Sequence, residues 1–221
     1  MRHCSVSVVL SLVALAGACT PYAVSTTAVP LARGEARSTS TLAIVRNGAE
    51  WSYDSSGSSR EGVAMPGIDT EVRFGLDDRS DFGVRIPTFS GVIGSYKRRL
   101  DGPSDRDAHA TAIMIGAGLV NFGQHAHGEI TLITSGRESA RLVPYGGFRA
   151  IQVLPLSRSA VQDTPAVGVF TGIKMGGRTP VLSAELGVFH DRSALGLRRS
   201  TVIVVPSIAI HSHLFSKLSL F

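Results

Sequence analysis

The sequence has few of the residues that cross-link or rigidify a small exported protein. Only two of its 221 residues are cysteines and one is tryptophan, and aromatic residues make up 6%. Charged residues make up 18%, which is low for a surface that faces water. Two cysteines cannot build a disulfide framework, so stability has to come from a packed core or from burial in lipid.

Helical patterning and catalytic motifs are also missing. After Cys19, no stretch combines apolar residues at i, i+3, i+4 and i+7 with a capping box. There is no G-x-S-x-G nucleophile elbow. Gly116-x-Gly118 lacks the third glycine and the helix of a dinucleotide-binding loop. We therefore assign no catalytic residue and no cofactor from the sequence.

The start of the chain has the pattern of an export signal. Met1-Arg2 is basic, residues 6–16 are apolar, and Ala16-Gly17-Ala18-Cys19 follows. This predicts a signal peptide over residues 1–18. The segment resembles a bacterial lipoprotein signal, which implies a lipid on Cys19, although Ala16 stands where an aliphatic residue is usual. An ordinary cut after Ala18 without lipid is the alternative.

Two further segments follow the signal. Residues 19–35 are small and polar, which predicts a flexible tether. Residues 36–221 are predicted to form one barrel domain. Cys4 leaves with the signal, so Cys19 has no partner for an intramolecular disulfide.

Short alternating runs predict strands. Residues 71–76 and 82–86 alternate strictly around a polar turn over residues 77–81, which is typical of a hairpin. The even spacing of such runs favours an all-β fold, a single antiparallel up-and-down β-barrel of about 8–10 strands. The other expected strands cover residues 36–45, 92–100, 108–119, 128–134, 141–153, 166–175, 181–190 and 201–211.

Each predicted strand has an aliphatic face and a face with glycines and isolated charges. Alternation alone leaves open which face points inward. The low charge content and the glycine-rich second face favour a membrane barrel with a polar lumen. A self-neutralising lumen network is the preferred interpretation of the charges, and a path for small solutes is the alternative. The candidate lumen charges are Glu71, Arg73, Arg85, Glu129, Arg149, Lys174 and Glu185.

The chain is basic, with a formal net charge of +5 and a pI of about 9.7. Its basic residues are scattered, and an exported chain is not expected to bind nucleic acid. Lys97-Arg98-Arg99 is the one cluster. We interpret it as a solvated strand end, with contact to anionic lipid headgroups as the alternative.

Histidines offer two weaker signals. His125-x-His127 and His211-x-His213 place two imidazoles on one strand face, but no third ligand completes a metal site in the sequence. We expect loop or strand-end histidines and no metal. A serine, His127 and Glu129 also suggest a nucleophile, a base and a carboxylate, a trio that chance easily produces.

Residues 71–86, EVRFGLDDRSDFGVRI, followed by Tyr96-Lys97, resemble strand-turn-strand segments of bacterial outer-membrane β-barrel proteins. Such proteins often end in an aromatic residue, and this chain ends in Phe221, although Lys217 and Ser219 depart from the usual apolar pattern. The resemblance implies an outer-membrane location with outer-membrane lipid as the partner. No protein partner is identifiable.

These features lead to one expected function and two alternatives. The first is an exported outer-membrane β-barrel lipoprotein, lipid-anchored, integral or both, with a structural or accessory role and a narrow polar lumen. The second is a lipid-tethered soluble periplasmic barrel that binds an apolar ligand. The third is a lipid-modifying barrel enzyme.

Overall fold

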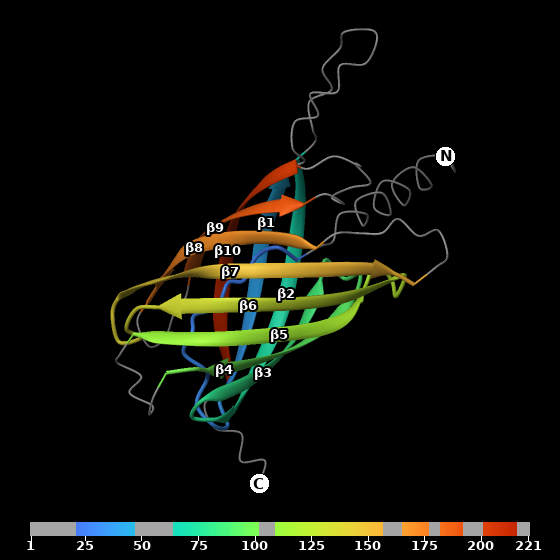
Figure 1. The fold of residues 1–221 in the computed structure, drawn as a ribbon. Helices are drawn as coiled ribbons and strands as arrows, with labels where there is room; N and C mark the ends of the chain where they lie inside the picture. Colours follow the sequence, from blue (N-terminus) through green and yellow to red (C-terminus); the bar gives the residue numbers. More distant parts are fainter. Residues whose placement is uncertain are drawn as a thin grey trace, which may run out of the picture.

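The chain forms a closed barrel of ten strands (Figure 1). The computed structural model describes residues 21–46, 64–101, 109–156, 165–176, 182–191 and 201–215. No helix among them is long and apolar enough to cross a membrane. The strands are β1 (Ala36–Arg46), β2 (Ala64–Asp77), β3 (Ser80–Pro87), β4 (Val92–Arg99), β5 (Ala110–Val120), β6 (His125–Ser135), β7 (Leu142–Pro155), β8 (Ala166–Met175), β9 (Leu182–Asp191) and β10 (Thr201–Phe215).

Every strand pairs with its sequence neighbours in antiparallel orientation, and β1 pairs with β10 to close the sheet. The register at this seam sets Leu42 of β1 opposite Ile208 of β10. Closure leaves no free edge, so the backbone groups within the sheet are paired. This confirms the predicted all-β, up-and-down barrel and sets its strand number at ten.

The barrel has two ends, here named the upper and the lower end. At the upper end β1 ends and β10 begins; at the lower end β1 begins and β10 ends (Figure 1). The connection over residues 47–63, predicted as a mobile loop, lies outside the described residues, as do the signal peptide and Cys19.

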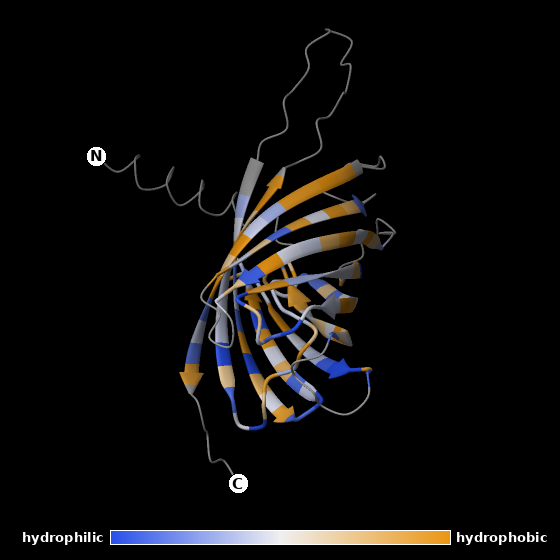
Figure 2. Ribbon diagram, turned by 90° about the vertical axis from the view of Figure 1, so that its left-hand side faces the viewer, coloured by the Kyte–Doolittle hydropathy of each residue, from blue (hydrophilic) through white to orange (hydrophobic). Residues whose placement is uncertain are grey.

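The aliphatic face points outward. Phe74, Leu76 and Phe82 of the first predicted hairpin are exposed, whereas Glu71 and Arg85 on the opposite face are buried. Figure 2 shows the same alternation of apolar and polar residues along the strands. The polarity is therefore the reverse of a water-soluble barrel, in which the apolar face is inside.

The segment before β1 lies inside the barrel. Residues 21–35 were predicted as a flexible tether, but Val24 and Ala28 are fully buried and Tyr22 is 5% exposed. We call residues 21–35 the lumen segment. It runs from the upper end, where Tyr22 packs on Phe189, to the lower end, where Gly34 donates a hydrogen bond to the carbonyl of Gly75.

Apolar residues of the lumen segment form two small cores with inward-facing side chains. The upper core surrounds Tyr22 and Ala23, and the lower core surrounds Val24, Ala28 and Val29. Both cores exist only because the segment is inside, since it supplies their central side chains. The strand residues of the upper core are Ala43, Val45, Ile151, Ala166, Phe189, Ile203 and Val205, and those of the lower core are Ala110, Ala112, Met114, Ile133, Tyr145 and Phe170.

Candidate functional site in the barrel lumen

The structure places all seven predicted lumen charges in the barrel interior. They come from β2, β3, β6, β7, β8 and β9, and each is at most 6% exposed. Five of them belong to two ion-pair groups, whereas Lys174 pairs with Glu138 and Glu185 binds the lumen segment. The residues are Glu71, Arg73, Arg85, Glu129, Arg149, Lys174 and Glu185.

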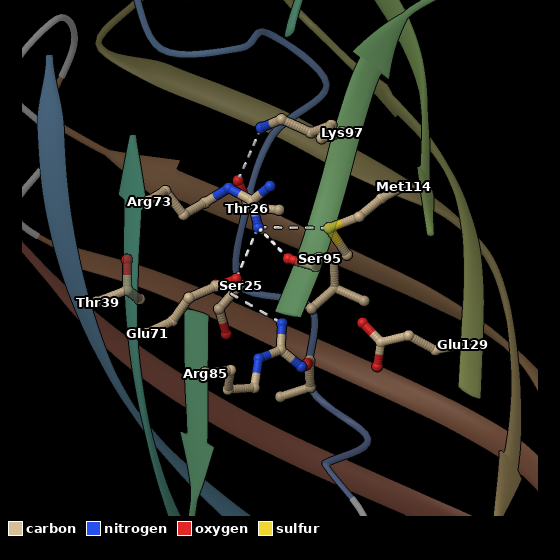
Figure 3. A network of polar contacts seen from close by, with 12 residues as sticks. Ser25, Thr26, Thr39, Glu71, Arg73, Arg85, Ser95, Lys97, Met114 and Glu129 are labelled. Carbon is tan, nitrogen blue, oxygen red and sulfur yellow. Dashed lines mark hydrogen bonds and ion pairs between the residues drawn. The ribbon is translucent and has the colours of Figure 1, made fainter. Parts of the chain in front are cut away.

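Arg73 is the centre of the first group (Figure 3). Its guanidinium lies 2.6 Å from Glu71 Oε1 and 2.5 Å from Asp81 Oδ1, and it also donates to Ser95 Oγ at 3.0 Å. A Cβ at position 83 would lie 2.7 Å from Arg73 Nη1, so Gly83 leaves the space that the guanidinium occupies. The planar fork of arginine suits this arrangement, because it holds two carboxylates in fixed positions.

Two more cations complete the first group. Arg85 Nη2 lies 3.6 Å from Glu71 Oε2, and Lys97 Nζ lies 3.1 Å from Asp81 Oδ2. Each carboxylate thus has two cationic partners. Mutual pairing of this kind is what allows charges to remain in a region with little water.

Lys174 pairs with a carboxylate outside the membrane-spanning strands. Its Nζ lies 2.7 Å from Glu138, in the turn between β6 and β7. Burial alone raises the pKa of Glu138, but the Lys174 ammonium and hydrogen bonds from Lys174 and Thr27 outweigh it and hold the pKa below its usual range. Glu138 is therefore ionised at neutral pH and ties the lower end of the barrel to the lumen segment.

The second group is built on Glu129. Its Oε2 lies 2.5 Å from Arg149 Nη2 and 2.9 Å from His127 Nε2. The suggested catalytic trio would need a serine hydroxyl at His127 as well. Among the described residues, no such hydroxyl is hydrogen-bonded to His127, and its printed partner is Glu129.

The cations of the lumen also bind carbonyl oxygens of the lumen segment. Arg149 Nη1 donates to the carbonyls of Tyr22 at 3.0 Å and Ala23 at 2.7 Å, and Arg85 Nη1 donates to Ala23 at 3.3 Å. Lys97 Nζ donates to the carbonyls of Thr27 at 3.0 Å and Val29 at 3.4 Å. These bonds satisfy carbonyls that would otherwise be buried without a partner.

The lumen anions bind N–H groups of the same segment. Val24 and Ser25 each donate a backbone N–H to Glu185, at 2.8 Å in both cases. Ser25 has a left-handed backbone with φ 50°, which turns two successive N–H groups toward one carboxylate, as in an anion-binding nest. Leu31 N donates to Asp81 Oδ2 at 3.1 Å.

Little space remains between the segment and the barrel wall. The cavity next to Thr26 and Lys97 measures about 20 Å³, room for about one water molecule. Its wall carries several basic side chains, including Arg37, Lys174 and His211.

Sequence reasoning missed a hydroxyl–imidazole chain. His211 Nε2 lies 3.0 Å from Ser183 Oγ and its Nδ1 lies 3.1 Å from Thr39 Oγ1. All three side chains are buried and come from β9, β10 and β1, so only the closed sheet brings them together. The described residues place no carboxylate within hydrogen-bonding distance of this imidazole, and the chain serves to pair polar groups across the seam.

Two interpretations of charged residues were wrong. Lys97 and Arg99 were interpreted as a solvated strand end, but they are 1% and 3% exposed and point inward, while Arg98 alone is exposed. Asp81 was placed in the turn, but β3 begins at Ser80 and Asp81 is fully buried. The sequence did contain a signal for both. Asp81 is an even number of positions from Arg85, and Lys97 is two positions from Ser95, so each shares the inward face of its strand.

The outer surface matches the inside-out pattern of a membrane barrel. Exposed aliphatic side chains cover the strands all around the described barrel. At the upper end, the β3–β4 turn carries Phe89 and the β5–β6 turn carries Phe122, which are 76% and 68% exposed. Aromatic residues at the rim of an apolar band are typical of the lipid–water interface. An outer groove of about 490 Å³, lined by residues such as Leu42 and Leu186, lies on this face.

The structure does not assemble the predicted histidine pairs into metal sites. His127 and His211 are buried, whereas His125 is half-buried and His213 is exposed. Within the part of the chain that the structure describes, no group of three or more His, Cys, Asp or Glu residues is placed to hold a metal ion.

Comparisons with known proteins give fold likenesses only. No protein-family model matches the sequence, and no curated protein matches it. Among solved structures, the chain is similar to Neisserial surface protein A (NspA), at 10% identity and TM-score 0.36, over 79% of this chain and 96% of that one. It is also similar to the outer membrane protein OprG from Pseudomonas aeruginosa, at 12% identity and TM-score 0.31, over 85% and 100%.

Proposed function

We propose that the chain is a bacterial outer-membrane β-barrel that is closed, with a structural or accessory role, and not an open pore. Its apolar side chains face outward around a charged interior, as in membrane barrels. The observation that carries the proposal is the lumen segment, whose residues 22–31 fill the interior.

The contacts of the segment support a permanently filled lumen in the resting protein. Glu185, Arg149 and Lys97 each bind its main chain, and apolar side chains of both cores surround it. Removing it would leave buried charges without these partners, which is costly in a region of low dielectric constant. The filled state is therefore strongly preferred.

Lipid attachment at Cys19 is the second part of the proposal. The support is the sequence Ala16-Gly17-Ala18-Cys19 after an apolar run. A multiply acylated cysteine adds a membrane anchor to that of the barrel, since each buried methylene contributes about 0.8 kcal/mol.

Conductance in planar lipid bilayers tests whether the barrel is closed. We expect the purified wild-type protein to insert without discrete current steps. The variant Ser25→Pro/Ala28→Pro should conduct, because proline removes two N–H donors and cannot adopt the left-handed backbone of Ser25. Val169→Ala, on the lipid-facing side, is the matched control and should remain closed. Sustained current steps from the wild type would contradict the proposal.

Fractionation tests the anchor. Mass spectrometry of the N-terminal peptide should show acylation at Cys19 and none in Cys19→Ser. Both proteins should stay in the outer membrane after carbonate extraction, because the barrel itself spans the bilayer. Release of Cys19→Ser into the soluble fraction would mean that the lipid was the sole anchor.

Neither alternative function has a supporting observation. A soluble barrel that binds an apolar ligand needs an apolar interior, and this interior holds ion pairs around Arg73 and Glu129. A lipid-modifying enzyme needs an activated nucleophile, and His127 contacts Glu129 and no described hydroxyl.

A further inference from the structure

The polar groups of the lumen bind mainly the main chain of the segment, while its apolar side chains pack in the two cores. Four N–H groups of the segment, those of Val24, Ser25, Ala28 and Leu31, donate to lumen side chains. Its carbonyls accept five further hydrogen bonds from Arg85, Lys97 and Arg149. Of its side chains, Thr26 accepts a hydrogen bond from Lys97 and Thr27 donates one to Glu138.

The groups that make these contacts are spaced along the whole lumen. Arg149 and Arg85 hold the upper part at Ala23, Glu185 holds Val24 and Ser25, Lys97 holds the middle, and Asp81 holds Leu31 at the lower part. Cations face carbonyls and anions face N–H groups at each level. This is the polarity that an extended polypeptide requires, and any sequence offers the same main-chain groups.

The segment contributes small or uncharged side chains wherever the wall is close. Ala23, Ala28 and Val29 pack on apolar wall residues, and the cavity beside Thr26 and Lys97 measures about 20 Å³. At these positions the described wall fits small, uncharged side chains.

From these contacts we infer that the lumen is a binding site for an extended, uncharged peptide of about ten residues that are small over its central part, and that residues 22–31 are its resident occupant. The inference rests on the proposed closed barrel and assigns a ligand class to its interior. A peptide of this class binds in the same register when the resident segment is weakened.

The test uses full-length protein in detergent micelles and a fluorescent peptide with the sequence of residues 22–31, YAVSTTAVPL. In the wild type the site is occupied, so we expect no binding by fluorescence anisotropy. In Ser25→Pro/Ala28→Pro, which keeps the wall intact but removes two of the segment's N–H donors, we expect saturable binding. Heat-modifiable migration on gels shows that this variant retains a folded barrel.

Two further peptides and one further variant distinguish main-chain recognition from nonspecific binding. A peptide N-methylated at the positions of Val24 and Ser25 should bind at least about tenfold more weakly, because it cannot donate to Glu185. Adding Glu185→Gln to the proline variant should weaken the unmodified peptide similarly. A shuffled peptide that permutes only the small residues 23–29 and keeps the Tyr, Pro and Leu in place should bind within a few-fold of the original, because it offers the same main-chain donors.

Several results would overturn the inference. The inference of a main-chain binding site in the lumen fails if the folded proline variant does not bind the peptide. It also fails if wild type and variant bind it equally, or if the N-methylated peptide binds as well as the unmodified one. Rejection of the shuffled peptide removes the assigned ligand class. The closed-barrel proposal has a separate outcome, because it fails only when the wild-type protein conducts current.

Discussion

The two sides of the lumen neutralise their charges by different means. On the β2–β4 side, Asp81 and Glu71 each have two cationic partners from the barrel wall. On the β9 side, Glu185 has no cation within ion-pair distance among the described residues and is instead bound by two N–H groups of the lumen segment and by the Tyr145 hydroxyl. One side is complete within the barrel, whereas the other requires the segment.

The ion pairs of the β2–β4 side therefore stabilise the barrel wall, whereas the hydrogen bonds of Glu185 hold the lumen segment in place. Ion pairs between strands stabilise the wall whether or not the segment is present, because their partners stay in the sheet. The Glu185 contacts stabilise only the filled state. Substitutions on the two sides should therefore affect different measurements.

The largest effect is expected from Arg73→Met. It leaves Asp81 and Glu71 buried with one cation each, which should lower the free energy of unfolding by about 3–5 kcal/mol. Urea unfolding from lipid vesicles, followed by tryptophan fluorescence or gel mobility, measures the change. Arg98→Met, on β4 of the same side but exposed, is the control and should unfold like the wild type. Equal behaviour of the two variants would contradict the asserted role of the β2–β4 network.

Gly75→Ala should have the next largest effect. A Cβ at this position would lie 1.9 Å from the carbonyl oxygen of Ala32, so the lower end of the lumen segment has to move. Overpacking against backbone typically costs about 1–3 kcal/mol. Hydrogen exchange of Gly34 and Gly75 should accelerate, because the bond from Gly34 N–H to the Gly75 carbonyl and the bond from Gly75 N–H to the Glu35 carbonyl both weaken.

Gly128→Ala is its matched control, since nothing lies within 4 Å of the added Cβ. It should leave both the unfolding midpoint and the exchange of Gly34 and Gly75 unchanged. A similar loss in both variants would show that alanine in the strand, and not contact with the segment, is responsible.

Glu185→Gln should reduce the free energy that holds the lumen segment in place by about 1–2 kcal/mol. The charge-assisted hydrogen bonds become neutral ones, while the removal of a buried charge offsets part of the loss. The effect should appear as faster hydrogen exchange of Val24 and Ser25. Combined with Ser25→Pro, it should be strongly non-additive, with a coupling of about 1 kcal/mol or more. Additive effects would mean that Glu185 acts independently of the segment.

The smallest effect concerns pH at Glu138. Because the pKa of Glu138 is lower in the folded protein than its unfolded value of 4.5, the associated stability is present above that value. It is lost as the pH falls through the lower folded pKa. Glu138→Gln should therefore unfold at lower urea than the wild type at pH 7, by less than about 1 kcal/mol. The difference should shrink in acid, and a difference that stays constant to pH 3 would contradict this origin.

The barrel itself could be predicted from the sequence because its signal is local. Strict alternation around Val72, Phe74 and Phe82 shows both the strands and the two faces, and Glu71, Arg73 and Arg85 fall on the charged face. Their inward direction needed the structure, since alternation is symmetric about the sheet. Exposure of Phe74 and burial of Arg73 settle it.

The lumen segment could not be predicted, because its order comes from distant residues. Its small residues and prolines have the composition of a linker, and it forms no helix or strand before β1. Glu185 and Arg149, which bind its main chain, lie more than 120 positions along the sequence. The burial of Asp81 and Lys97 was missed for a similar reason. A polar run such as residues 77–81 or a basic run such as residues 97–99 normally faces solvent, and only the alternation along the strand shows which of its side chains point inward.

The path of the lumen segment also bears on how the chain reaches its final shape. The seam joins β1 to β10, the most distant strands in the sequence, and Glu185 meets its two N–H donors only when β9 is in place. A barrel that closed without the segment would bury Glu185 without its two N–H donors, whereas closure around the segment supplies them. We therefore expect barrel closure to be slower in Ser25→Pro than in the wild type.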